Sequence, residues 1–166
     1  MCFTAKDSAG NRDLIAHNGF NFYYYDTVLG WKIAANAVPS GTVTYATAQG
    51  YTYIYVANVG CYRFDHNTKA MVAVTLTGLA PSLLLGITAF QGYLVAWGAA
   101  SISWSTTLDW SATPNTIDFV PSLITGAGGG DVEGAKGRIT FCASLTSGIL
   151  CYTTENAVSA IYSGNA

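Results

Sequence analysis

Short apolar segments alternate with polar, glycine-containing turns along most of this chain, and one pattern occurs four times. Each copy has an apolar strand, a turn, an aromatic strand, a second turn and a third strand. The four copies are Leu14–Ala34, Tyr45–Asp65, Ile87–Leu108 and Ile139–Ser163. Aromatic and β-branched residues at such positions favour pleated, half-buried strands. The pattern therefore predicts an all-β protein built from four similar units.

A turn dipeptide sets the register of each copy. The four dipeptides are Asn18-Gly19, Gln49-Gly50, Gln91-Gly92 and Ser147-Gly148. Glycine accepts the positive φ that tight hairpin turns need. A three-stranded unit of this size has two apolar faces and cannot bury both alone, so neighbouring units must stack. We therefore predict a β-propeller-like array of about four small antiparallel blades, with a stacked all-β array or sandwich as the alternative.

The predicted array forms a single propeller-like domain over residues 1–166. Its parts are blades at about 12–41, 42–80, 81–121 and 135–166, and a loop at 122–136. Met71–Leu76 is expected as the outer strand of the second blade, and Thr116–Val120 as that of the third. The fourth blade has no outer strand of its own before Ala166. Either Met1–Ala5 pairs with this blade and closes the ring, which removes both open edges, or the chain is part of a longer propeller whose remaining blades lie beyond Ala166. We expect the second arrangement.

The composition points to a surface that is neutral or covered. Hydrophobic residues make up 51% of the chain, charged residues only 10%, and the formal net charge is −2. A typical soluble domain has about 25% charged residues. We expect burial in an assembly, with a neutral-surfaced monomer as the alternative. Direct nucleic-acid binding is not expected, because the sequence has no basic run.

One charge-free stretch, between Lys69 and Asp109, is long enough to raise the question of a membrane span. Pro81, Gly86 and the turn Gln91-Gly92 interrupt it, so no span is expected. Charged residues near the start of the chain also interrupt any apolar signal segment.

The glycine-rich stretch Gly126–Gly137 invites comparison with phosphate-binding loops. It lacks the third glycine of the dinucleotide fingerprint, and Lys136 is followed by glycine rather than by Ser or Thr. Its two acidic residues would also repel a phosphate. We predict a flexible loop between blades whose function is to contact a neighbouring subunit. The candidate contact residues are Gly126, Gly128, Gly129, Gly130, Asp131 and Glu133, with Trp110 as an exposed aromatic residue nearby.

The acidic residues and histidines do not predict an enzyme. The nine acids lie mostly at strand ends or in turns, and residues such as Asp26 and Asp65 are expected to initiate turns. Glycoside hydrolysis needs two carboxylates that face a sugar, and no such pair is evident. His17 and His66 are expected in solvated turns, too little for a metal site. We expect no catalytic residue, no metal and no cofactor.

The four cysteines are expected to be reduced, buried thiols. If Ser147-Gly148 forms the turn, Cys142 and Cys151 are diagonal neighbours, too far apart for an unstrained bridge. If the turn shifts to Thr146-Ser147, these two cysteines face each other directly.

Three segments resemble β-propeller structural proteins of tailed bacteriophages. They are SISWSTTLDWSATPNTIDFVPSLITGAGGG (Ser101–Gly130), the following AKGRITF, and ILCYTTENAVSAIYSGN (Ile149–Asn165). The resemblance covers residues from about Arg12 to Asn165. It implies a virion component of the tail or its nozzle that is copied around the tail axis and acts through subunit contacts, without enzymatic activity.

We therefore expect a structural virion protein, assembled in the host cytoplasm, whose partners are other copies of itself and other tail proteins. A carbohydrate- or host-receptor-binding propeller is the alternative, and under this alternative the ligand could be a glycan. A glycoside hydrolase is the least favoured reading. A binding module would have exposed aromatic residues grouped at one end, and an enzyme would have paired carboxylates in a central channel.

Overall fold

The computed structural model describes residues 1–7, 9–108 and 115–161. Within these residues the chain forms sixteen β-strands and one short 3₁₀ turn, η1 (Pro81–Leu83), and no α-helix. The all-β prediction is therefore confirmed. No helix in these ranges is long and apolar enough to cross a membrane.

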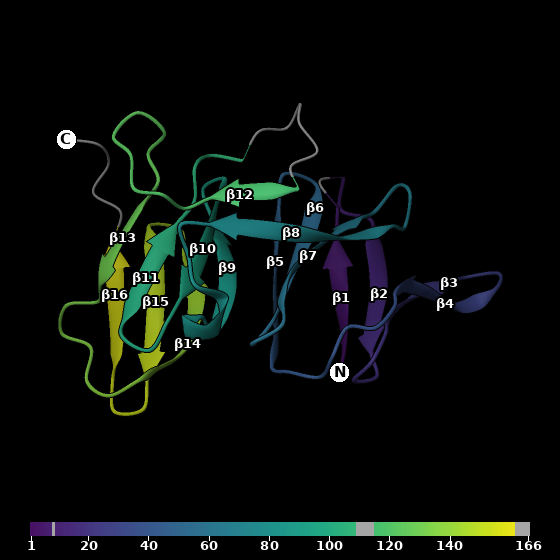
Figure 1. Ribbon diagram of the computed structural model, residues 1–166, viewed down its shortest axis with the longest axis horizontal. Coiled ribbons are helices and arrows are strands. Elements are labelled where there is room, and N and C mark those ends of the chain that lie inside the picture. The colour runs from purple at the N-terminus through teal and green to yellow at the C-terminus, as the bar shows by residue number, and fades with distance from the viewer. Residues whose placement is uncertain (8, 109–114, 162–166) are drawn as a thin grey trace.

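The strands form four sheets, which we number along the chain (Figure 1). The first sheet contains β1 (Cys2–Lys6), β2 (Arg12–His17), β3 (Phe22–Asp26) and β4 (Gly30–Ala35). The second contains β5 (Val43–Ala48), β6 (Tyr51–Val56), β7 (Gly60–Asp65), β8 (Met71–Thr77) and β12 (Thr116–Asp118). The third contains β9 (Gly86–Phe90), β10 (Tyr93–Trp97), β11 (Ser101–Trp104) and β13 (Gly128–Asp131). The fourth contains β14 (Ile139–Ser144), β15 (Gly148–Thr153) and β16 (Ala157–Ile161).

Two of the predicted turn dipeptides form tight hairpin turns. Gln49 and Gly50 have φ angles of 56° and 79°, and Gln91 and Gly92 have φ angles of 47° and 86°. Positive φ at both central residues defines the turn type whose twist matches that of the flanking strands. The local signal in the sequence therefore locates both hairpins.

The hairpin of the fourth sheet turns one residue earlier than Ser147-Gly148. The Leu145 amide donates to the Gly148 carbonyl oxygen at 2.8 Å, which leaves Thr146-Ser147 as the centre of the turn. Cys142 and Cys151 are consequently direct partners across β14 and β15. Of the two turn positions that the sequence left open, the structure therefore has Thr146-Ser147, which places the two thiols face to face.

The first sheet begins one strand earlier than the sequence pattern indicates. Strand β1 pairs with β2 through partners such as Cys2 and Ala16. The turn at Asn18-Gly19 therefore joins the second and third strands of its sheet, whereas Gln49-Gly50 joins the first and second. The alternative in which Met1–Ala5 pairs with the last blade is wrong, because this segment lies at the other end of the molecule (Figure 1).

Two expectations about outer strands are also corrected. Strand β12, expected in the third sheet, pairs in parallel with β8 of the second. The outer strand of the third sheet is instead β13, which pairs with β11 through partners such as Ser103 and Gly129. The prediction of an irregular loop over 122–136 is therefore wrong for Gly128–Asp131. Glycine has low strand propensity, which is why the sequence pattern concealed this strand.

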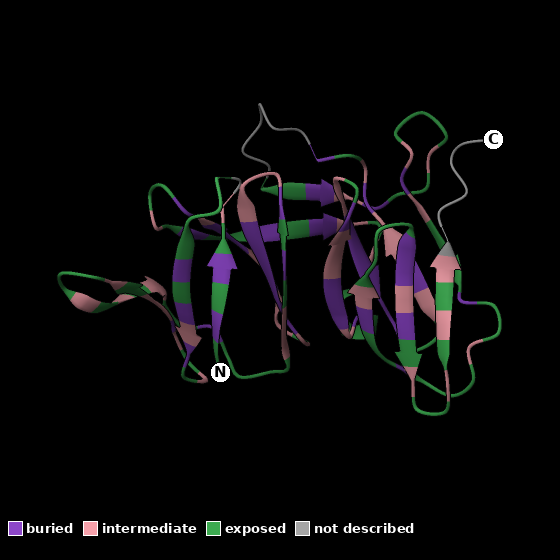
Figure 2. Ribbon diagram, turned by 180° about the vertical axis from the view of Figure 1, so that it is seen from behind, coloured by how far each residue is buried: buried purple, intermediate pink, exposed green. Residues whose placement is uncertain are grey.

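The sheets stack in chain order, and each junction contains its own apolar core (Figure 2). Between the first and second sheets, Ile15, Phe22, Ile54 and Phe64 are fully buried. Between the second and third, the core is formed around Tyr53, Tyr55, Ile87, Leu94 and Phe119. Between the third and fourth, it is formed around Trp97, Ile102, Ile139, Cys142 and Ile149.

The first strands of successive sheets lie close together. The rings of Phe3 on β1 and Tyr45 on β5 stack with their centroids 4.1 Å apart. The Ile87 amide on β9 donates to Thr44 Oγ1 on β5 at 3.0 Å. The first and fourth sheets lie at opposite ends of the row (Figures 1 and 2).

Candidate functional site

The predicted contact residues are distributed over one turn, one strand and the loop that follows. Gly126 ends the turn before β13, Gly128, Gly129, Gly130 and Asp131 form that strand, and Glu133 follows it. Gly130, Asp131 and Glu133 are exposed. Trp110 lies outside the described residues. The structure thus brings together six of the seven candidates along the outer edge of the third sheet.

Trp104 on β11 holds this glycine strand in place. Its indole Nε1–H donates to the Gly126 carbonyl oxygen at 2.8 Å. A Cβ atom at Gly128 would lie 2.8 Å from the same indole ring, and one at Gly129 would lie 2.8 Å from the Ile102 carbonyl oxygen. Glycine is needed here because any side chain would push the strand away from its partner.

The turn that precedes β13 exposes two large apolar side chains that sequence analysis missed. Leu123 and Ile124 have exposed fractions of 104% and 96%. Ser122 closes this turn, because its carbonyl oxygen accepts from the Gly126 amide at 2.9 Å. Apolar residues in a tight turn gain nothing from the fold itself, so this tip is a candidate contact point.

A hollow of about 490 Å³ lies between the outer strands of the third and fourth sheets. It is lined by Trp104 on β11, by residues 129–134, and by Val158 to Ala160 on β16. An aromatic ring beside acidic side chains and backbone groups is a combination that suits a polar, partly apolar ligand. Asp131 and Glu133 both lie on the exposed rim.

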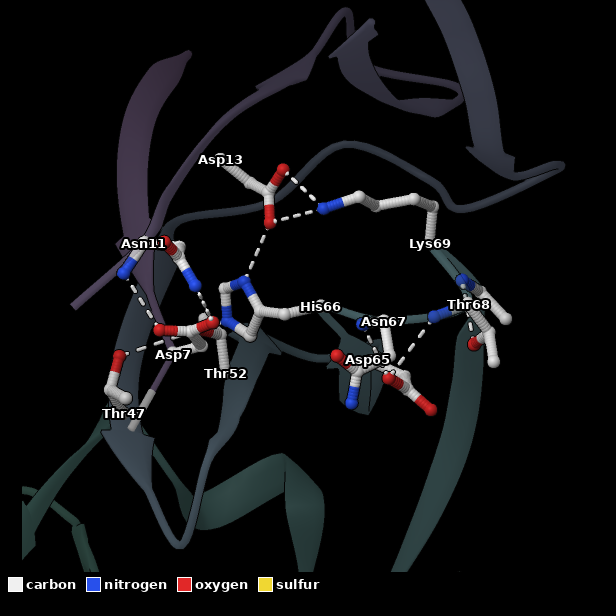
Figure 3. Close-up of polar contacts among 11 residues, drawn as sticks. Asp7, Asn11, Asp13, Thr47, Thr52, Asp65, His66, Asn67, Thr68 and Lys69 are labelled. Carbon is white, nitrogen blue, oxygen red and sulfur yellow. Dashed lines mark hydrogen bonds and ion pairs between the residues drawn. The ribbon is translucent and has the colours of Figure 1, made fainter. Parts of the chain in front are cut away.

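A second polar cluster, which the sequence did not indicate, is buried between the first and second sheets (Figure 3). Asp13 on β2 lies 2.7 Å from His66 Nδ1, and both its oxygens accept from Lys69 Nζ at 2.7 and 2.8 Å. His66 Nε2 lies 2.9 Å from Thr52 Oγ1, which in turn lies 3.3 Å from Thr47 Oγ1.

The order Asp13, His66, Thr52 is that of a carboxylate, a histidine and a hydroxyl in acyl-transfer enzymes. Thr52 has no exposed surface, however, and His66 is only 5% exposed. A substrate cannot reach a hydroxyl that is enclosed between two sheets. The cluster therefore acts as a structural link: every buried polar group in it has a partner, as burial requires.

Both histidines are buried, which corrects the prediction of solvated turns, although His66 does lie in a turn. His17 is the last residue of β2 and is buried, with Nε2 3.0 Å from the Val38 carbonyl oxygen. His66 follows β7 directly and contacts a residue far away in the chain. No group of three or more His, Cys, Asp or Glu residues in the described ranges could hold a metal ion.

The turn-initiating aspartates behave as predicted. Asp26 Oδ1 accepts from the amides of Val28 and Leu29, and Asp65 Oδ1 accepts from those of Asn67 and Thr68. Burial acts to raise the pKa of Asp65, but these amide hydrogen bonds outweigh it and hold the pKa below its ordinary value. These carboxylates stabilise turns.

Three of the four cysteines are buried thiols, as expected, and Cys2 is exposed. The Sγ atoms of Cys142 and Cys151 lie 3.4 Å apart. The hydrogen bond between the two thiols raises the pKa of Cys142 and lowers that of Cys151. Burial raises the pKa of Cys61 to about 12. The facing pair is close enough for a disulfide after a small movement, given an oxidant.

No protein-family model matches this chain, and no curated protein matches its sequence. Functional inference therefore rests on the contacts above and on the sequence pattern. Two regions have features beyond those the fold needs. One is the outer edge of the third sheet, with its hollow and exposed tip. The other is the pair of end sheets, which expose Trp31 and Ile33 on the first and Phe141 and Tyr152 on the fourth.

Proposed function

We propose that this chain is a structural protein of a bacteriophage virion, a tail or nozzle component that acts through contacts with other copies of itself and with other virion proteins. The sequence resemblance over about Arg12 to Asn165 supports the virion part of the proposal. The low content of charged residues, 10%, supports the contact part, because a neutral surface loses little hydration on assembly.

The proposal includes a propeller arrangement. Successive sheets meet through their first strands, as blades do around a propeller axis. The contact of Thr44 on β5 with Ile87 on β9 and the stacking of Phe3 on Tyr45 support this view. The four sheets then correspond to an arc of blades, with β12 and β13 on the outside of the second and third.

The observation that carries the proposal is the exposed apolar surface at both ends of the row of sheets. Trp31 and Ile33 on the first sheet are 47% and 52% exposed, and Phe141 and Tyr152 on the fourth are 50% and 43% exposed. Contiguous apolar patches of this kind mark interaction sites. Such surfaces are buried when a subunit joins an assembly, whereas a domain that stays monomeric exposes mainly polar surface in their place.

Immunogold electron microscopy tests the location. An antibody raised against the chain should label the tail region of purified phage particles from the host in which the gene is expressed. Label confined to host membranes or cytosol, with unlabelled particles, would contradict the virion assignment.

One observation favours a second candidate, a carbohydrate- or receptor-binding module. The hollow beside Trp104 has an aromatic wall and two acidic side chains, Asp131 and Glu133, which suit sugar hydroxyl groups. A glycan array should then give a signal that the double substitution Asp131→Ala and Glu133→Ala abolishes. Both carboxylates are exposed to solvent, whereas glycoside hydrolysis uses carboxylates in an enclosed site from which water is excluded.

A further inference from the structure

The second and third sheets are covered on both sides, whereas the end sheets are covered on one. On the second sheet, neighbouring residues Ile54 and Tyr55 on β6 point to opposite faces and are both 0% exposed. On the third, Leu94 and Val95 on β10 are 0% and 3% exposed. Because strand residues alternate between faces, two consecutive buried residues mean that both faces carry a neighbouring sheet.

The fourth sheet has one open face. On β15, Cys151 is 0% exposed but its neighbour Tyr152 is 43% exposed. Tyr152 is the direct partner of Phe141 on β14, and Leu150 is the partner of Ala143, so these four side chains share the outer face. None of them is charged. Phe141 lies on the edge strand of this sheet, and its ring also contacts Trp97 of the third sheet, with the centroids 6.0 Å apart.

The first sheet has the opposite open face. On β2, Ile15 is 0% exposed and packs toward the second sheet, whereas Leu14 is 38% exposed. Tyr25 on β3 is paired with Trp31 on β4, and Tyr23 with Ile33. The hairpin of β3 and β4 stands out from the body of the molecule, with Val28 and Leu29 exposed at its tip (Figures 1 and 2).

These two faces are the unmatched halves of a contact that the molecule makes three times. At each internal junction, the face of one sheet that points toward the next sheet packs against the face of that next sheet that points back. In the fourth sheet, the face that would point toward a following sheet is exposed. In the first sheet, the face that would point toward a preceding sheet is exposed. Stacked repeats that act alone carry polar outer faces on their terminal units. These two terminal faces expose mainly apolar side chains, although the paired residues Lys6 and Arg12 add two positive charges at the β1–β2 end of the first sheet's face.

We propose that the outer face of the fourth sheet of one copy packs against the outer face of the first sheet of a second copy, so that copies join head to tail and continue the stack. This inference rests on the proposed function and specifies the contact that function would use. The partner is a second copy of this chain, because the exposed faces continue the sheet-on-sheet packing seen inside the molecule. The contact is heterologous, so it leads to a ring or an open array rather than to a closed two-fold dimer.

Two single substitutions separate the two faces. Ile33→Lys places a charge on the first sheet's outer face, and Tyr152→Lys places one on the fourth sheet's outer face. Val72→Lys on β8 is the matched control, since Val72 is an exposed apolar residue (37%) of the second sheet and belongs to neither end sheet. Circular dichroism and the unfolding midpoint verify that all three variants fold.

Sedimentation velocity over a range of concentrations gives the readout. We expect wild type and Val72→Lys to associate, and each face variant alone to associate at least about tenfold more weakly. An equal mixture of Ile33→Lys and Tyr152→Lys should form one-to-one dimers and nothing larger, because each partner retains the face that the other has lost.

Three other results would overturn the inference. If the Tyr152→Lys variant still dimerises alone, the first sheet's face pairs with itself. If wild type associates and neither face variant weakens it, the contact lies elsewhere, for example at Leu123 and Ile124, and the proposed function stands. If wild type stays monomeric at every concentration, the contact does not exist between copies, and the location of the protein in particles decides the proposed function separately.

Discussion

At the scale of residues, the buried cluster around Asp13 illustrates how this protein ties one sheet to the next. A carboxylate enclosed between sheets loses much of its hydration, and His66 and Lys69 replace it with two charge-assisted contacts of 2.7 Å. Replacing Asp13 with asparagine removes the charge and one of the two oxygens that His66 and Lys69 share as acceptors, and it puts a donor NH2 group beside these two partners.

Asp13→Asn should lower the free energy of unfolding at neutral pH. We expect a loss of about 2 kcal/mol. This is smaller than the loss that follows when one partner of a fully buried ion pair is removed, because Lys69 reaches solvent. Urea denaturation measures the change, and Asp131→Asn, on an exposed carboxylate, is the control, with an expected effect within about 0.5 kcal/mol. Equal effects of the two substitutions would show that the cluster is not a structural link.

Tyr53 gives the protein a specific sensitivity to alkali. Burial raises its pKa from 10.0 to about 12, while in the unfolded chain the phenol ionises near the ordinary value. The stability contribution of the neutral phenol is therefore complete below about pH 10 and is lost as the pH rises toward 12.

Tyr53→Phe should remove this contribution. We expect the variant to lose less free energy of unfolding than wild type between pH 9.5 and about pH 11.5, measured by urea denaturation at each pH. Tyr25→Phe, at an exposed position, should retain the wild-type profile. Parallel pH profiles for wild type and Tyr53→Phe would contradict the assignment.

At the scale of elements, strand β13 shows a sequence that forms a strand against its propensity. Within β13, Gly129 is the glycine whose Cβ atom would meet backbone, because it would contact both Ser103 Oγ and the Ile102 carbonyl oxygen of the adjacent strand. Gly130, one residue later, has no heavy atom within 4 Å of such a Cβ position.

Gly129→Ala should therefore destabilise the protein by about 1–3 kcal/mol, because the strand must shift. Gly130→Ala should be neutral or slightly stabilising, since it only restricts the unfolded chain. Thermal and urea unfolding of the two variants make a matched comparison. A neutral Gly129→Ala would mean that β13 does not lie against β11 in solution.

The contrast between β13 and the hairpins explains what the sequence reveals. The turns at Gln49-Gly50 and Gln91-Gly92 and the alternating strands around them are local features, so they were predictable. The pairing of β12 with β8 joins residues far apart in the chain, and the glycine strand depends on the close approach of Trp104. Neither has a signal within a short window of sequence.

The candidate sites follow the same division. The exposure of Gly130, Asp131 and Glu133, among the candidate contact residues, was predictable from the sequence. The burial of His66 was not, because its partner Asp13 lies 53 residues away. Leu123 and Ile124 were missed because two adjacent apolar residues usually indicate a buried strand. Only the tertiary arrangement shows them to be exposed.

At the scale of the whole molecule, copies of this protein are proposed to meet at the two end faces. Hydroxyl-radical footprinting at low and high protein concentration tests this contact directly, because aromatic side chains react readily. Tyr45 on β5, in the middle of the row, is 40% exposed, close to the 43% of Tyr152 and the 44% of Tyr25, and so provides an internal reference.

We predict that labelling of Tyr152 and Phe141 at one end, and of Tyr25 and Trp31 at the other, falls together as the concentration rises, while labelling of Tyr45 is unchanged. Two results would contradict the account. One is that labelling falls at only one end, and the other is that the labelling of all five residues does not change with concentration.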